Sequence, residues 1–129
     1  MRLRLESFPP VLSCSQGGYN TIVPIENITD IVKELHQELA RQLGGRLEAV
    51  YLYGSRARGD AHPDSDIDLL IVIREEFDYF ELLEMTSYLI WTYSLDNNVV
   101  ISRAFVSTEQ FKRADTPFLM NVQREAVLV

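Results

Sequence analysis

The stretch from residue 52 to residue 73 constrains this chain more than any other part of it. An apolar run over residues 49–53 predicts a buried strand, and Gly54-Ser55 ends that run. The ten residues 56–65 follow as a mostly polar loop, and Asp66-Ile67-Asp68 then opens a second apolar run that continues to residue 73. Since the second run is apolar on both faces after its aspartates, we expect it to lie in the middle of a sheet.

The two aspartates of the second run are predicted to share a face. Side chains two residues apart on a strand point to the same side, so Asp66 and Asp68 face one way and Ile67 the other. Neighbouring ionised carboxylates repel each other, and a cation between them relieves that repulsion. Carboxylate oxygens favour Mg²⁺, with Mn²⁺ as a substitute, and Mg²⁺ is typically held by one or two carboxylates plus substrate phosphates. We therefore predict that Asp66 and Asp68 are catalytic metal ligands.

The end of the first strand predicts a phosphate site. Glycine has no Cβ, so Gly54 lets backbone N–H groups approach a phosphate, and the Ser55 hydroxyl adds a donor. Arg56 and Arg58 suit phosphate oxygens, and we expect residues 55–58 to form a helical turn. Ser65 is expected to cap or orient the aspartate that follows it. A phosphate site beside a metal site is what transfer from a metal-bound nucleoside triphosphate requires.

A plainer interpretation treats the same residues as a glycine turn followed by an edge strand with two solvated acids. It leaves unexplained why Gly54-Ser55 ends the preceding strand. His62 in the loop could approach a phosphate, and Asp60 or Asp64 could touch a metal. Such residues more often only shape a loop, so they stay outside the predicted site.

The spacing of these motifs resembles a known signature. Gly54-Ser55, ten residues and then Asp66-x-Asp68 is similar to the signature of the nucleotidyltransferase (polymerase-β-like) superfamily. The string GSRARGDAHPDSDIDLLIV most resembles its minimal branch, whose members are often encoded beside HEPN-domain partners. The resemblance extends from about residue 25 to the C-terminus. It implies an α/β nucleotidyltransferase fold, with a short mixed β-sheet and helices packed mainly on one face.

The resemblance also implies an activity. Such a protein moves a nucleoside monophosphate, here AMP from ATP or the corresponding monophosphate from another nucleoside triphosphate, to a hydroxyl acceptor in an Mg²⁺-dependent reaction. The acceptor implied is a HEPN-type toxin, which would make this chain an antitoxin of a toxin–antitoxin system. Gly54, Ser55, Arg56, Arg58 and Ser65 would then contact the nucleotide, with an arginine neutralising the leaving group.

One departure from the family pattern keeps alternatives open. Active members usually carry a third carboxylate on the strand after the next helix, but residues 99–106 contain no acid. Asp96 precedes that strand and Glu109 follows it, and neither fits the strand alternation. The first alternative is therefore a non-catalytic interaction protein that binds and neutralises a partner with a degenerate metal site. A weaker one is transfer to a small molecule such as an aminoglycoside, for which members usually carry an extra domain.

Composition sets limits on partners and location. A chain of 129 residues with 47% apolar and 24% charged residues fits one globular domain. The net charge of −7 argues against a general nucleic-acid binder and fits docking on a basic partner. The single cysteine, Cys14, excludes an intrachain disulfide and predicts a cytoplasmic protein. No run approaches the roughly 18 apolar residues of a membrane span.

The remaining pattern predicts the other elements and the domain boundary. Residues 1–24 are expected to be an N-terminal extension, either a mobile arm or a partner contact, with a short alternating strand over Arg2–Leu5, and residues 25–129 form the nucleotidyltransferase domain. Helices are predicted over 26–43, 77–95, a short segment after Ser107, and 116–125. Strands are predicted over 48–53, 66–73, 99–106 and 127–129. An apolar stripe is expected in the core: Ile28, Val32, Leu35, Leu39 and Leu43.

For two of the predicted helices, the sequence allows either core packing or a partner surface for part of the apolar side chains. The aromatic residues Phe80, Tyr88 and Trp91 broaden the apolar side of the second helix and predict core packing more than a partner surface. The last helix carries Phe118, Leu119, Met120 and Val122, which either pack on the sheet or, where exposed, form an interface with a partner or a second copy.

Overall fold

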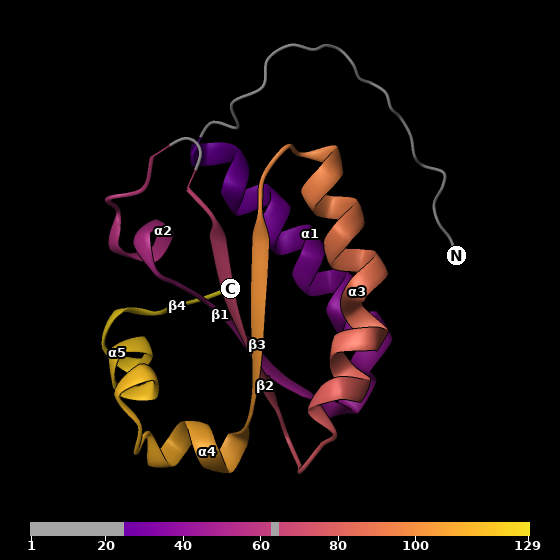
Figure 1. Ribbon diagram of the computed structural model, residues 1–129, viewed down its shortest axis with the longest axis vertical. Coiled ribbons are helices and arrows are strands. Elements are labelled where there is room, and N and C mark those ends of the chain that lie inside the picture. The colour runs from indigo at the N-terminus through magenta and orange to yellow at the C-terminus, as the bar shows by residue number, and fades with distance from the viewer. Residues whose placement is uncertain (1–24, 63–64) are drawn as a thin grey trace.

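The computed structural model describes residues 25–62 and 65–129 and shows a sheet between two layers of helices (Figure 1). In chain order the elements are α1 (Ile25–Leu43), the 3-10 turn η2 (Gly44–Arg46), β1 (Leu47–Tyr53), α2 (Ser55–Arg58), β2 (Ile67–Ile73), α3 (Tyr79–Asp96), β3 (Ile101–Ser107), α4 (Thr108–Arg113), α5 (Pro117–Glu125) and β4 (Val127–Leu128). These bounds agree with the predicted elements to within about two residues.

The sheet is mixed, with the strand order β3-β2-β1-β4. β1 runs antiparallel to both β2 and β4, and β2 runs parallel to β3 through the crossover helix α3. The central place of β2 confirms the interpretation of its two-sided apolar run, since all of its residues except Asp68 are buried. β3 forms one edge of the sheet and faces the viewer in Figure 1.

The two long helices, α1 and α3, cover one face of the sheet (Figure 1). The predicted α1 stripe is fully confirmed: Ile28, Val32, Leu35, Leu39 and Leu43 are all buried. They pack against β2 residues with odd numbers, such as Ile67 and Leu69. Gly44 ends α1 with φ +57°, a conformation that glycine adopts without the steric penalty of a side chain.

The short helices α4 and α5 pack on the opposite face, where Leu70 and Val72 meet Leu119 and Val122. Both begin at a side-chain cap. Ser107 and Gln110 form a capping box at the start of α4. Thr116 caps α5 and precedes its first residue, Pro117.

Helix α3, predicted over residues 77–95, differs from the prediction in which of its side chains are buried. Its buried side consists of Leu82, Thr86 and Ile90, at four-residue spacing. Phe80, Tyr88 and Trp91 are 67%, 65% and 61% exposed, so the aromatic side chains predicted for the core lie on the surface. Their positions fall on helical faces turned away from the sheet, and aromatic content alone does not reveal that direction.

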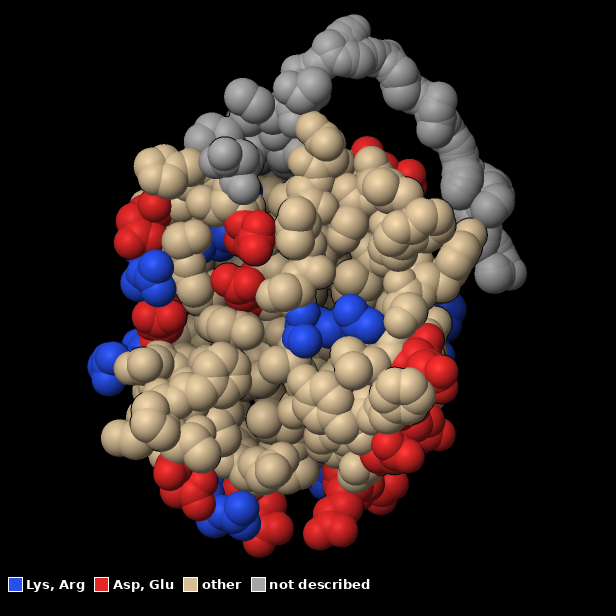
Figure 2. Space-filling view, viewed as in Figure 1, with Lys and Arg blue, Asp and Glu red and all other residues tan. Residues whose placement is uncertain are grey.

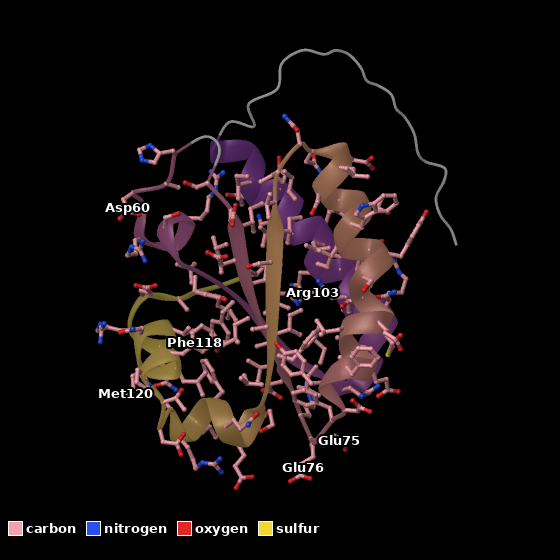
Figure 3. The ribbon with its side chains drawn as sticks, in the orientation of Figure 1. Asp60, Glu75, Glu76, Arg103, Phe118 and Met120 are labelled. Atoms are coloured by element: carbon pink, nitrogen blue, oxygen red, sulfur yellow. The ribbon has the colours of Figure 1, made fainter. Side chains whose placement is uncertain are left out.

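In helix α5, some of the apolar side chains pack on the sheet and others are exposed, as each of the two interpretations proposed for part of them. Leu119 and Val122 are buried against the sheet, whereas Phe118 and Met120 are 42% and 54% exposed (Figure 3). The expectations for residues 1–24, including the strand over Arg2–Leu5, lie outside the described residues. None of the described helices combines the length and the apolar character needed to cross a membrane.

Candidate functional site

The turn after β1 lies directly against the carboxylate of Asp68. The last residue of β1, Tyr53, pairs with Asp68 across the antiparallel ladder, which brings the following Gly54 next to that side chain. Gly54 adopts φ +77° and ψ −157°, a combination that is essentially restricted to glycine. A Cβ added to Gly54 would overlap Asp68 Oδ2. The fold therefore needs glycine here for both its backbone conformation and its missing side chain.

The two aspartates lie at the start of β2, on the face of the sheet opposite α1 and α3. Ile67 is fully buried against those helices, and its N–H donates to the carbonyl of Val100 at 2.8 Å, so the backbone is already extended there. Asp66 immediately precedes the strand and is exposed, whereas Asp68 is half-buried. Strand alternation directs Asp68 away from the α1–α3 face, to the side on which Leu70 and Val72 lie, and Asp66 stands two residues before it.

Ser102 is a site residue that the sequence did not reveal. In the parallel pairing of β2 with β3, Asp68 is opposite Ser102. The Ser102 hydroxyl donates a hydrogen bond to Asp68 Oδ1 at 2.7 Å. A serine in a predicted strand carries no functional signal by itself. Only the register between two strands separated by a helix brings Ser102 beside Asp68.

The predicted phosphate residues fall in α2 and in the loop that follows it. Residues 55–58 form the expected helical turn, with Gly54 as its N-cap. Arg56 Nη2 donates to the backbone carbonyl of Ser65 at 2.7 Å, which ties α2 to the residue before the aspartates. The Ser65 hydroxyl accepts from the N–H of His62 at 2.8 Å, so in this structure it braces the loop.

Arg58 is directed toward the C-terminal helix. Its guanidinium pairs with Asp60 and with Glu125 of α5, each at 3.3 Å. These carboxylates raise the pKa of Arg58, with the Asp60 hydrogen bond as the largest cause. Asp60 lies at the outer edge of this group (Figure 3). Arg58 thus joins α2 to α5, and Arg56 is the arginine that contacts the loop leading to the aspartates.

Tyr53 forms an aromatic wall beside the carboxylates. Its ring meets Phe118 of α5 edge to face, with 5.5 Å between the ring centroids. Burial, and after it the negative charge of Asp68, raise the pKa of Tyr53 above its ordinary value. The phenol therefore stays neutral at physiological pH.

The donor set fits a divalent cation held by two carboxylates. Asp66 and Asp68 supply hard oxygen atoms, and Asp68 keeps lone pairs free beyond the one that accepts from Ser102. In the described part of the chain, no three histidine, cysteine, aspartate or glutamate side chains gather as a metal site. This agrees with the absence of an acid from β3, so substrate phosphates would have to complete the coordination.

Arg103, the next residue of β3, belongs to the other face of the sheet. Its side chain lies between β3 and α3 (Figure 3), where Nε donates to Thr86 Oγ1 at 2.7 Å and Nη2 donates to the carbonyl of Leu83 at 2.8 Å. Arg103 also lines a shallow hollow with Trp91 of α3. Because this hollow is separated from Asp68 by the sheet, we give it no part in the chemistry.

Figure 2 shows how the charged side chains are distributed over one face of the molecule. Acidic and basic side chains lie mainly around its rim, and the described lysine and arginine residues form no broad basic surface there.

Comparison with known proteins places this chain in a family. Residues 26–124 match the family model described as the nucleotidyltransferase domain. The chain is 37% identical over 95 residues to the "Putative protein adenylyltransferase MJ0604" of Methanocaldococcus jannaschii, covering 73% of this chain and 89% of that protein.

Solved structures show the same fold. A "putative minimal nucleotidyltransferase" superposes with a TM-score of 0.57 at 26% identity, covering 83% of this chain and 97% of the other. A "toxin-antitoxin with AMP-PNP" superposes with a TM-score of 0.51 at 23% identity, covering 74% and 70% of the two chains, and at that identity it supports the fold alone. With its glycine turn, paired aspartates and mixed sheet, the chain belongs to the nucleotidyltransferase domain family.

Proposed function

We propose that this chain transfers AMP from ATP to a hydroxyl acceptor and releases pyrophosphate. The observation that carries the proposal is the packing of Gly54 against the carboxylate of Asp68. It joins the end of β1 and the start of β2, the two motifs that would hold the phosphates and the metal. The missing side chain of Gly54 lets the turn after β1 approach the half-buried carboxylate of Asp68 directly.

Each residue has a role in this proposal. Asp66 and Asp68 hold Mg²⁺, for which Mn²⁺ can substitute, and when bound the ion neutralises phosphate charge and favours attack at the α-phosphorus. Gly54 and Ser55 accommodate the triphosphate through backbone N–H groups and the serine hydroxyl. Arg56, with Arg58 beside it, offsets charge that builds on the departing pyrophosphate. Ser65 fixes the loop that precedes the aspartates.

The proposed acceptor is a hydroxyl on a protein partner, of the HEPN type that the motif resemblance implies, with this chain as the antitoxin. The name of the M. jannaschii relative, a protein adenylyltransferase, supports a protein acceptor. The toxin–antitoxin structure with AMP-PNP has the same fold as this chain, and this likeness of fold is what supports the proposal of a toxin partner. Exposed apolar side chains on α3 and α5, including Trp91 and Met120, offer surface for such a partner or for a second copy. We place the reaction in the cytoplasm, where ATP is available and cysteine side chains stay reduced.

Two labelled forms of ATP test the transfer reaction. The protein is incubated with Mg²⁺, the product of a neighbouring gene, and ATP labelled on either the α- or the γ-phosphate. We expect the α-label to become attached to protein and the γ-label to leave as pyrophosphate. Asp68→Asn keeps the side-chain shape but removes the charge, and it should abolish attachment. Attachment of the γ-label instead would indicate a kinase and overturn the proposal.

The second candidate is a binding protein that neutralises its partner without chemistry. The observation that favours it is that the described residues provide no third acid for the metal site. This candidate predicts that Asp66→Ala/Asp68→Ala protein still forms a stable complex with the partner and still suppresses its toxicity. Transfer of AMP predicts that complex formation survives but suppression is lost.

A further inference from the structure

We propose that Ser102 is a positioning residue that orients the Asp68 carboxylate for cation binding. The proposal rests on the cation site assigned above to Asp66 and Asp68, and it adds a residue of β3 to that site. The Ser102 hydroxyl donates to Asp68 Oδ1 at 2.7 Å, a distance typical of a good O–H···O bond.

Asp68 is held from both neighbouring strands. On the β3 side Ser102 fixes Oδ1, and on the β1 side Oδ2 occupies the space that the missing Cβ of Gly54 leaves open. Because β2 lies between β3 and β1, these two contacts restrict rotation of the carboxylate in both directions. A carboxylate restricted in this way presents its remaining lone pairs in one direction and loses little conformational freedom when a cation binds.

The two aspartates differ in this respect. Asp66 is exposed and precedes the strand, whereas Asp68 is half-buried within it. The order imposed on Asp68 thus provides the fixed half of the site, and Asp66 can adjust to the ion. Groups that hydrogen-bond a metal ligand commonly change metal affinity about 10–100-fold when they are removed.

The position of Ser102 is itself held from the other face of the sheet. The next residue, Arg103, is anchored to α3 through Thr86 and Leu83. Alternation along β3 then directs Ser102 to the face that carries Asp68. A hydroxyl at this register position donates a hydrogen bond, which a carboxylate there could not do while ionised.

Binding of Mn²⁺ alone to the full chain tests this proposal. The free Mn²⁺ signal in electron paramagnetic resonance is followed during titration of wild type, Ser102→Ala and Ser102→Thr. We expect Ser102→Ala to weaken Mn²⁺ binding about tenfold. Ser102→Thr keeps the hydroxyl and should stay close to wild type, a rescue that a purely structural role of the serine would not produce.

Two further variants make the result decisive. Ser94→Ala removes a serine hydroxyl from α3, on the opposite side of the sheet, and it should bind Mn²⁺ like wild type. If Ser102→Ala does not fold, Ser102→Cys retains the size with only a weak donor and should also bind weakly.

The outcomes separate this inference from the proposed function. Wild-type affinity in folded Ser102→Ala or Ser102→Cys, with binding lost in Asp68→Asn, would overturn the role of Ser102 and leave the cation site intact. Unchanged affinity in Asp68→Asn would overturn the cation site, and the role of Ser102 with it.

Discussion

At the scale of single residues, the proposed site depends on how closely Gly54 and Ser102 approach the carboxylate of Asp68. Gly54 directly follows β1, Asp68 lies in β2 and Ser102 lies in β3, and each contact can be tested by a single substitution. The sequence revealed Gly54 and Asp68 because they belong to one local motif. It did not reveal Ser102, because the contact depends on strand register across a helix.

Gly54→Ala should damage the site more than the fold. The φ/ψ values of Gly54 cost an alanine about 1–3 kcal/mol of strain, and the new methyl group would displace the Asp68 carboxylate. We expect the variant to fold with a lower free energy of unfolding and to bind Mn²⁺ and ATP at least tenfold less tightly. Urea unfolding and Mn²⁺ titration measure the two effects. Gly45→Ala is the matched control, since nothing lies within 4 Å of a Cβ there. Equal binding by Gly54→Ala and wild type would show that the close contact has no function.

Ser102→Asp tests the same site by placing a second carboxylate beside Asp68. A second carboxylate beside Asp68 should destabilise the metal-free protein by about 1 kcal/mol, since like charges opposite each other repel. A divalent cation between the two acids should reverse that loss. Urea unfolding in a chelator and in Mn²⁺ measures both states. If Mn²⁺ stabilises this variant no more than wild type, Ser102 does not face the cation site.

At the scale of elements, most of the secondary structure could be predicted because local signals agreed. The α1 stripe, Gly44, the capping box at Ser107 and Thr116-Pro117 each fix an element end or a buried face by local physics. The direction of the α3 aromatic side chains could not be predicted, because Tyr88 and Trp91 extend an apolar pattern that α3 buries only at Leu82, Thr86 and Ile90. The division of α5 into buried Leu119 and exposed Met120 likewise depends on tertiary contacts.

Thr86→Val tests the bond between α3 and β3. Thr86 is fully buried and its hydroxyl accepts from Arg103 Nε, so valine leaves that donor without its acceptor. Burial already lowers the pKa of Arg103, although the guanidinium remains charged at physiological pH. We expect a loss of about 1–3 kcal/mol in the free energy of unfolding by urea.

Thr92→Val, on the same helix, is the control and should change the free energy of unfolding by less than about 0.5 kcal/mol. Equal effects of the two substitutions would mean that the Thr86–Arg103 bond contributes nothing specific.

At the scale of the whole molecule, ligand binding and folding are linked. A ligand that binds only the folded chain, at 100 times its dissociation constant, adds about 2.7 kcal/mol to the free energy of unfolding. We therefore expect ATP with Mg²⁺ to raise the midpoint of thermal unfolding, and ATP with a chelator to raise it much less. Asp66→Asn/Asp68→Asn should remove the metal-dependent part. Equal stabilisation of this variant would show that ATP binds elsewhere.

In the proposed function, this small acidic protein attaches AMP to a partner through Asp66 and Asp68. Its most direct test is the intact mass of the partner encoded beside this gene, after incubation with the protein, ATP and Mg²⁺. We expect a gain of one or more AMP units with wild type and none with Asp68→Asn. An unchanged mass with wild type, while the two proteins form a stable complex, would contradict transfer and support a protein that acts by binding alone.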